Sequence, residues 1–174
     1  QQQKIAIEVG GKLLLSQETL LDRRLYAQAL HSLEESLKNI LKTGAIIANP
    51  SKGENSNEPN YFFDWLRDSW LYVNLLALLY QMTGNQELER LINSHIVFAE
   101  NSASRRQPNI QRTDVFGFEP KENWGDQNDG PGHAAAAMIE YLQYLLLEQS
   151  KEADKINKYY SIIRGNLDFI CSPK

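Results

Sequence analysis

The order of helix types along the chain constrains the fold more than any other feature. Leucine and isoleucine recur at spacings of three and four across about residues 16–42, which predicts an amphipathic helix. Residues 71–82 are apolar on all sides, so the helix that begins near Asp68 and ends at Thr83–Gly84 should be buried on most faces. Asp68 or Ser69 can cap its start. A half-apolar surface helix follows over about residues 86–101.

Two further helices repeat this order. Pro131 opens a second helix with little polar face, and residues 152–171 carry an apolar stripe opposite Lys and Asp. Concentric helical barrels place all-round apolar helices inside and half-apolar helices outside, so the loops before Asp68 and Pro131 should share one rim. About five helices cannot close such a ring, and we expect an open apolar edge.

The N-terminal segment has a different pattern. Ile5 to Val9 alternates apolar and polar residues before Gly10–Gly11, which predicts a short β-hairpin. We therefore expect residues 1–15 to form an extension or hairpin and residues 16–174 to form the helical domain.

Composition excludes several classes of function. A net charge of −4 with scattered basic residues does not favour nucleic acid, and no apolar run approaches the roughly 20 residues of a membrane span. The single Cys171 has no internal disulfide partner, and the three histidines, His31, His95 and His133, are isolated. We expect no metal and no cofactor, and we assign the histidines to packing or to the surface.

Aromatic and charged residues gather just before the helix at Asp68. Sugar recognition uses such a set, because pyranose C–H faces lie on aromatic rings while hydroxyls bond to Arg and Asp. The simpler interpretation is a helix cap, a surface ion pair and aromatic core residues. The residues are Tyr61, Phe62, Phe63, Trp65, Arg67, Asp68 and Trp70.

A second group lies in the long segment before Pro131, which is too long for a simple connection and suggests a functional loop. Trp124 beside Gly125 is difficult to explain as a core residue. The simpler interpretation makes Trp124 a loop anchor and Asp129 a helix cap. The chemically interesting residues are Glu119, Lys121, Trp124, Asp126 and Asp129.

Four motifs resemble those of fungal and yeast glucoamylases, glycoside hydrolase family fifteen, in the family's order. They are "GAIIANPS", "PNYFFDWLRDSWL", "FEPK" and "WGDQNDGP", within about Ser32 to Ile170. The resemblance implies an (α/α)6 barrel, of which this chain supplies about the first half with roughly five long helices.

The resemblance also implies roles for individual residues. Arg67 and Asp68 match the pair that holds hydroxyls of the terminal glucose, and Tyr61 matches the tyrosine near the developing oxocarbenium ion. Trp65 matches the aromatic residue lining the same pocket. Trp124 matches the tryptophan beside the next glucose, and Lys121 matches a pocket lysine.

This sequence departs from the family pattern in several places, one of which is Gly132-His133-Ala134 where the family has Ala-Leu-Arg. Only two residues separate Lys121 from Trp124, which shortens that rim, and Asp126 replaces an Arg-Pro pair. The chain also ends at Lys174, before the segment in which the family carries its general acid. We therefore expect the general acid and base to lie beyond Lys174.

The implied activity is release of glucose from non-reducing ends of α-1,4-glucans with inversion. The rest of the polypeptide would be needed to close the barrel, and the isolated chain would expose residues 71–82 and 134–147 and self-associate. Alternatives are a glucan-binding or regulatory barrel without catalysis, and a trehalase or dextran-acting relative. An acid–base pair of Asp68 and Asp129 is disfavoured, because a carboxylate beside Arg67 suits a hydroxyl acceptor better.

Overall fold

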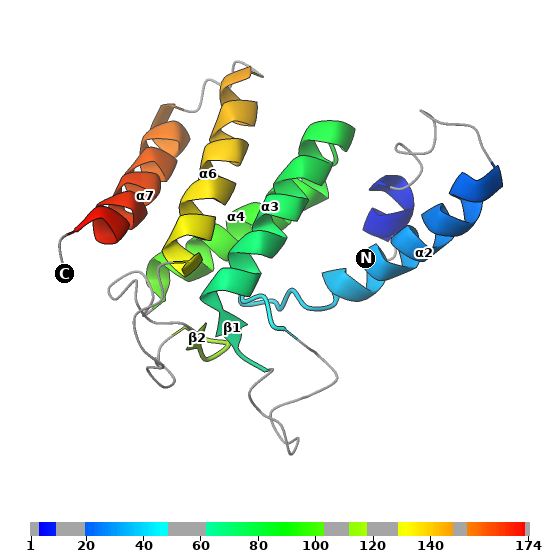
Figure 1. Cartoon of the computed structure of the whole chain (residues 1–174), viewed down its shortest axis with the longest axis horizontal. Coiled ribbons are helices and arrows are strands. Elements are labelled where there is room, and N and C mark those ends of the chain that lie inside the picture. The colour runs from blue at the N-terminus through cyan, green and yellow to red at the C-terminus, as the bar shows by residue number, and fades with distance from the viewer. Residues whose placement is uncertain are drawn as a thin grey trace.

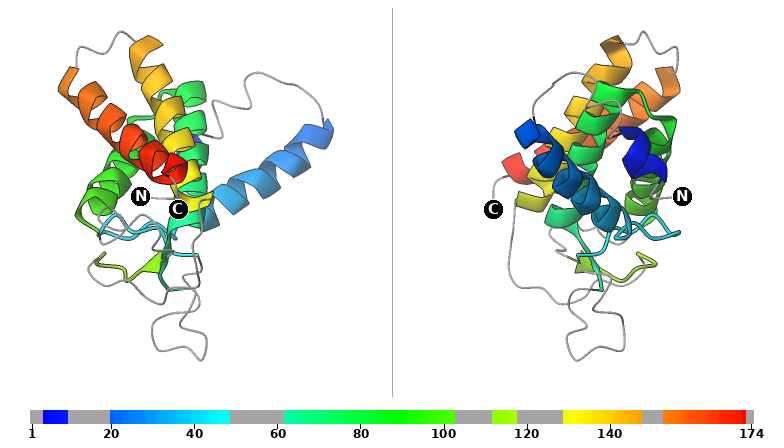
Figure 2. Two further views of the ribbon diagram at one scale, coloured as in Figure 1. Left: turned by 60° about the vertical axis from the view of Figure 1, so that its left-hand side comes forward. Right: turned by 90° about the vertical axis from the view of Figure 1, so that its right-hand side faces the viewer.

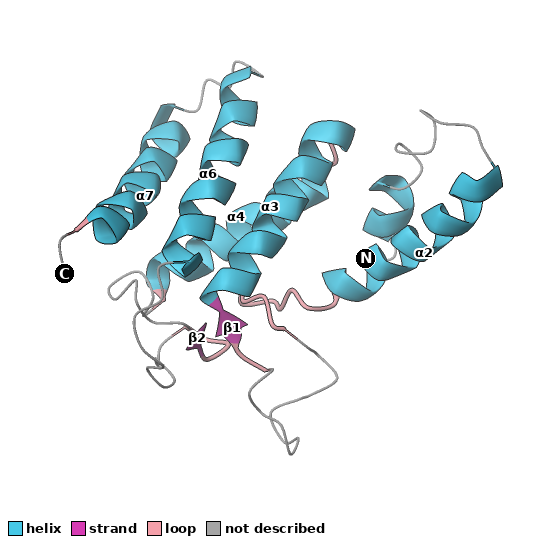
Figure 3. Ribbon diagram, in the orientation of Figure 1, coloured by secondary structure: helices cyan, strands magenta, loops and turns pink. Residues whose placement is uncertain are grey.

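A computed structural model describes residues 4–9, 20–48, 62–102, 112–117, 129–147 and 153–172. Its named elements are almost all helical (Figure 3). The helices are α2 (Leu20–Leu37), α3 (Leu66–Thr83), α4 (Gln86–Asn101), α6 (Asp129–Leu147) and α7 (Ala153–Cys171), and the strands are β1 (Asp64–Trp65) and β2 (Arg112–Thr113). The predicted all-α class is confirmed.

The helices form two neighbouring hairpins. α4 runs back along α3, α7 runs back along α6, and α3 packs most extensively against α6 (Figure 1). α3 and α6 therefore lie side by side, with α4 and α7 against them, as expected for part of a helical toroid. α3 and α6 begin at the same end of the bundle, and two further views show the β1–β2 ribbon at that end (Figure 2).

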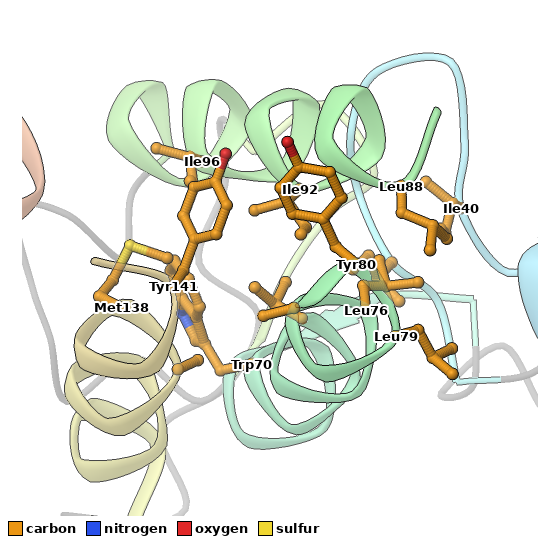
Figure 4. Close-up of a cluster of buried hydrophobic side chains, with 14 of the residues drawn as sticks. Ile40, Trp70, Leu76, Leu79, Tyr80, Leu88, Ile92, Ile96, Met138 and Tyr141 are labelled. Atoms are coloured by element: carbon orange, nitrogen blue, oxygen red, sulfur yellow. The ribbon is translucent and has the colours of Figure 1, made fainter. Parts of the chain in front are cut away.

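The core lies between α3, α4 and α6 (Figure 4). Each large apolar side chain buried there contributes roughly 1.5–3 kcal/mol relative to an exposed position. Prominent members are Leu76 and Tyr80 of α3, Leu88, Ile92 and Ile96 of α4, and Met138 and Tyr141 of α6.

Tyrosine hydroxyls fasten α4 to the inner helices. Tyr80 and Tyr141 both point towards α4 (Figure 4) and donate to the two carboxylate oxygens of Glu89, at 3.0 and 3.1 Å. Tyr159 of α7 donates to Asn93 of α4 at 2.5 Å. Burial raises the pKa of Tyr141 well above its ordinary value of 10.0, so its hydroxyl stays protonated and can donate to Glu89.

α2 is joined to α3 by a similar bond. The Tyr72 hydroxyl of α3 donates to Ser36 Oγ at 2.8 Å, and burial raises the pKa of Tyr72 to about 12. Leu37, at the end of α2, is fully buried, and Leu30 and Leu33 pack against the core.

The predicted end of α3 is correct, but the predicted cap at its start is wrong. Gly84 adopts φ 64°, and its N–H donates to the Tyr80 carbonyl. The N-cap is Trp65, without a side-chain cap bond, instead of Asp68 or Ser69. The helix thus begins earlier than predicted and includes Arg67 and Asp68 in its first turn.

The predicted N-terminal hairpin is also wrong over its described part. Residues 4–9 are helical, and Ile5, Ala6 and Val9 are buried in the core. Residues at these spacings share one face of a helix, and burial of that face outweighs the local alternation.

α3 is less enclosed than its composition predicts. Leu71, Leu75, Leu78 and Met82 are 45%, 42%, 43% and 59% exposed, and their spacing places them on one stripe. The expectation of exposed apolar surface over residues 71–82 is therefore confirmed. Among the described helices, none is both long and apolar enough to cross a membrane.

Candidate functional site

The candidate site lies where α3 and α6 begin, beside the β1–β2 ribbon (Figure 1). Gly130, in the first turn of α6, allows the two helix starts to approach closely. A Cβ atom at Gly130 would lie 2.8 Å from Leu66 Cδ2. The starts of α3 and α6 therefore lie at one rim.

Arg67 connects two carboxylates at this rim. Its Nε donates to Asp68 Oδ1 at 3.1 Å, and its Nη1 lies 3.5 Å from Asp129 Oδ2. The three side chains are 51%, 45% and 40% exposed, so solvent or a ligand can reach them. The hydrogen bond to Asp68 raises the pKa of Arg67 above its ordinary value, which keeps the guanidinium charged.

Trp65, two residues before Arg67 in the chain, contacts Arg112 across the ribbon. Trp65 pairs with Arg112, and Asp64 pairs with Thr113, in antiparallel register. The Arg112 guanidinium carbon lies 5.1 Å from the Trp65 ring centroid and 4.8 Å from that of Phe63. Arg112 is only 4% exposed, whereas Trp65 is half-buried.

Asp64 anchors the opposite face of the ribbon. Its Oδ2 accepts a hydrogen bond from the Ile46 backbone N–H at 2.7 Å and lies 3.8 Å from His95 Nδ1. His95 Nδ1 is also 3.0 Å from the Gly44 carbonyl oxygen, which can only accept, so this nitrogen carries the proton. Burial raises the pKa of Asp64, and the nearby His95 opposes that shift.

Three of the predicted site residues are brought together by the fold. Trp65, Arg67 and Asp68 lie at the start of α3, with Asp129 beside them. Trp70 does not join them, because it is buried in the core with its ring centroid 5.0 Å from that of His95. The predicted residues that lie outside the described part of the chain are Tyr61, Glu119, Lys121, Trp124 and Asp126.

Sequence reasoning missed two structural contributors, Arg112 and Asp64. Arg112 lies in a segment without periodicity, and its partner Trp65 is far away along the chain. The assignment of His95 to packing is confirmed, but its proximity to Asp64 required the fold. Among the described residues, no group of three or more His, Cys, Asp or Glu side chains could hold a metal ion.

Comparison with known proteins adds a finding independent of this geometry. The family model described as Glycosyl hydrolases family 15 matches residues 22–173. The chain belongs to this family. The match includes α3, α4, α6 and α7, the ribbon and all the residues of the candidate site.

Curated relatives agree with membership of family 15. Glucoamylase-1 of Arthroderma benhamiae is 29% identical over 145 residues, covering 74% of this chain and 22% of the relative. A probable glucoamylase of Schizosaccharomyces pombe is 30% identical over 142 residues, covering 74% of this chain and 30% of the relative. The intracellular sporulation-specific glucoamylase of Saccharomyces cerevisiae is 27% identical over 149 residues, covering 72% of this chain and 26% of the relative.

The chain therefore spans less than a third of the length of these relatives. No solved structure matches it. In this family 15 segment, charged side chains that can bond to hydroxyls lie in the first turns of α3 and α6, and the N-cap Trp65 supplies an aromatic ring of the kind that contacts a sugar face.

Proposed function

We propose that this chain forms the sugar-recognition wall of a glucoamylase-type glycoside hydrolase. The reaction is release of glucose from non-reducing ends of α-1,4-glucans, with inversion at the anomeric carbon. The observation that carries the proposal is the Arg67 guanidinium held between Asp68 and Asp129, next to the half-buried Trp65. Neighbouring sugar hydroxyls need both donors and acceptors, and this group supplies them at one rim.

Arg67 and Asp68 take the role of clamping hydroxyls of the terminal glucose, and Trp65 lies against its apolar face. Tyr61, Lys121 and Trp124 complete the wall in the proposal. No described residue is given the general acid or base role, because both carboxylates at the rim, Asp68 and Asp129, contact Arg67. Beside the Arg67 donor, both carboxylates are placed to accept hydrogen bonds from sugar hydroxyls.

A direct test uses the longest polypeptide that the gene encodes. Hydrolysis of maltoheptaose is followed by NMR of the anomeric proton, and inversion predicts that β-glucose appears first. Initial release of α-glucose would refute the assignment. Maltose, isomaltose and trehalose in parallel distinguish an α-1,4-glucan enzyme from a dextran-acting or trehalase-type relative.

Recognition is tested separately with residues 1–174, by titrating maltose and following tryptophan fluorescence or the heat of binding. Arg67→Met should abolish the response, because it removes a charged hydroxyl donor and leaves two carboxylates without it. Arg164→Met is the matched control, since Arg164 makes a 3.5 Å exposed ion pair with Asp168 on α7. If both variants bind maltose equally well, Arg67 does not take part in maltose binding.

A glucan-binding or regulatory domain without catalysis is the second candidate. It is favoured by the pairing of both rim carboxylates with Arg67. Maltose binding by the longest polypeptide, without glucose release from any substrate in the panel, would support this candidate over the hydrolase.

A further inference from the structure

We propose that Arg112 is a positioning residue that sets the plane of the Trp65 indole for contact with sugar. The inference rests on the proposed sugar-recognition function and deepens it, because it assigns a role to a residue outside the Arg67–Asp68 rim.

The geometry of the ribbon directs Arg112 onto Trp65. The two residues are direct partners in the antiparallel register, and such partners place their side chains on the same face. Successive residues of a strand point to opposite faces, so Asp64 faces the other way, towards Ile46 and His95. Phe63, just before β1, lies on the Trp65 side as well, because the Arg112 guanidinium contacts both rings.

Arg112 therefore contacts two aromatic rings from one position. The guanidinium carbon is 4.8 Å from the Phe63 centroid and 5.1 Å from the Trp65 centroid, both within the range of cation–π attraction. Arginine at 4% exposure needs compensation for lost hydration, and the electron-rich ring faces supply part of it. The attraction also holds the rings in place.

Holding Trp65 matters because of its place in the chain. Trp65 ends β1 and is the N-cap of α3, two residues before Arg67. Trp65 as a whole is half-buried while its ring contacts Arg112, so part of the residue remains reachable. A ring that is already oriented loses less side-chain freedom when a sugar stacks on it, and binding is correspondingly tighter.

The test compares Arg112→Met, Arg112→Lys and wild type in the longest polypeptide that the gene encodes, with maltose as substrate. Arg112→Met keeps an unbranched apolar stem but removes the cation. We expect KM to rise about tenfold, or about 1.4 kcal/mol of binding, with little change in kcat. Arg112→Lys should recover much of this loss, because an ammonium is also attracted to ring faces.

Two controls separate positioning from general stability. Arg164→Met, at a 71%-exposed position on α7, should leave KM unchanged. Unfolding midpoints are measured for every variant, and kinetics are recorded well below each midpoint. If Arg112→Met lowers the midpoint but leaves KM at the wild-type value, Arg112 is merely structural and the inference is overturned.

Phe63→Leu gives an independent test if Arg112→Met does not fold. It removes one ring from the guanidinium without altering Arg112 or Trp65, and KM should rise about threefold. An unchanged KM would overturn the inference while leaving the proposed function intact. If the wild type neither hydrolyses nor binds maltose, the proposed function fails and the inference falls with it.

Discussion

Replacing Gly44 by alanine should destabilise the protein much more than the same change at Gly84. Both glycines have positive φ, 91° and 64°, a region that costs an L-residue about 1–2 kcal/mol. They differ in their surroundings. A Cβ at Gly44 would lie 2.3 Å from the Ser94 carbonyl oxygen of α4, whereas nothing lies within 4 Å of a Cβ at Gly84.

The clash at Gly44 adds a second cost, because a backbone oxygen in a helix cannot move aside easily. Overpacking of this kind costs about 1–3 kcal/mol, so Gly44→Ala should lose about 2–5 kcal/mol in total. Gly84→Ala should lose only the conformational part, about 1–2 kcal/mol. For a chain of this length, each kcal/mol corresponds to a fall of about 2–4 °C in Tm.

The assay is urea unfolding followed by far-UV circular dichroism, with wild type and both variants at one protein concentration. Gly44→Ala should also weaken maltose binding, because the Gly44 carbonyl bonds to His95 next to Asp64. If Gly84→Ala costs as much as Gly44→Ala, close packing of this loop against α4 is not the reason for glycine, and the reasoning fails.

Three other predictions concern different parts of the molecule. The pKa of Asp64 is raised above its ordinary 3.8 on folding, so its contribution to stability is complete below that pH and is lost as pH rises through the folded pKa. The free energy of unfolding of Asp64→Asn should therefore increase relative to that of wild type as pH rises. Parallel plots of unfolding free energy against pH for the two proteins would contradict this. Tyr141→Phe removes a hydrogen-bond donor from the Glu89 carboxylate and should lower the free energy of unfolding by about 1.5–3 kcal/mol in the same assay. A loss below about 0.5 kcal/mol would show that this hydrogen bond does not stabilise the fold. Leu75→Lys with Leu78→Lys should reduce self-association of the 174-residue chain by light scattering, and a monomeric wild type would refute the role of this stripe.

Most of the helical architecture could be predicted because its signal is local. Apolar spacing placed α4 at its observed bounds, and Gly84 marked the end of α3. The hairpin prediction failed because residues 5–9 are too few to separate alternation from a helical face. The cap at Asp68 was wrong because the chain enters α3 directly from β1.

The candidate site was predictable only where its residues are neighbours in sequence. Trp65, Arg67 and Asp68 lie together in one segment, so their common location follows from a single turn of helix. Asp129 joins them through the packing of α6 on α3, and Arg112 joins them through strand pairing. Such contacts depend on tertiary structure, which no local pattern encodes.

The ribbon that carries Trp65 and Arg112 consists of only two residue pairs, and this has a consequence for heat inactivation. Two residue pairs supply few ladder bonds, even with the further bridge between Asp64 and Ile47, and parts of a protein can open with less free energy than global unfolding requires. Maltose recognition should then be lost on warming before the helical circular dichroism signal falls. Bound maltose should reduce the temperature difference between these two losses, because a ligand that binds only the paired ribbon stabilises the paired state by its binding free energy.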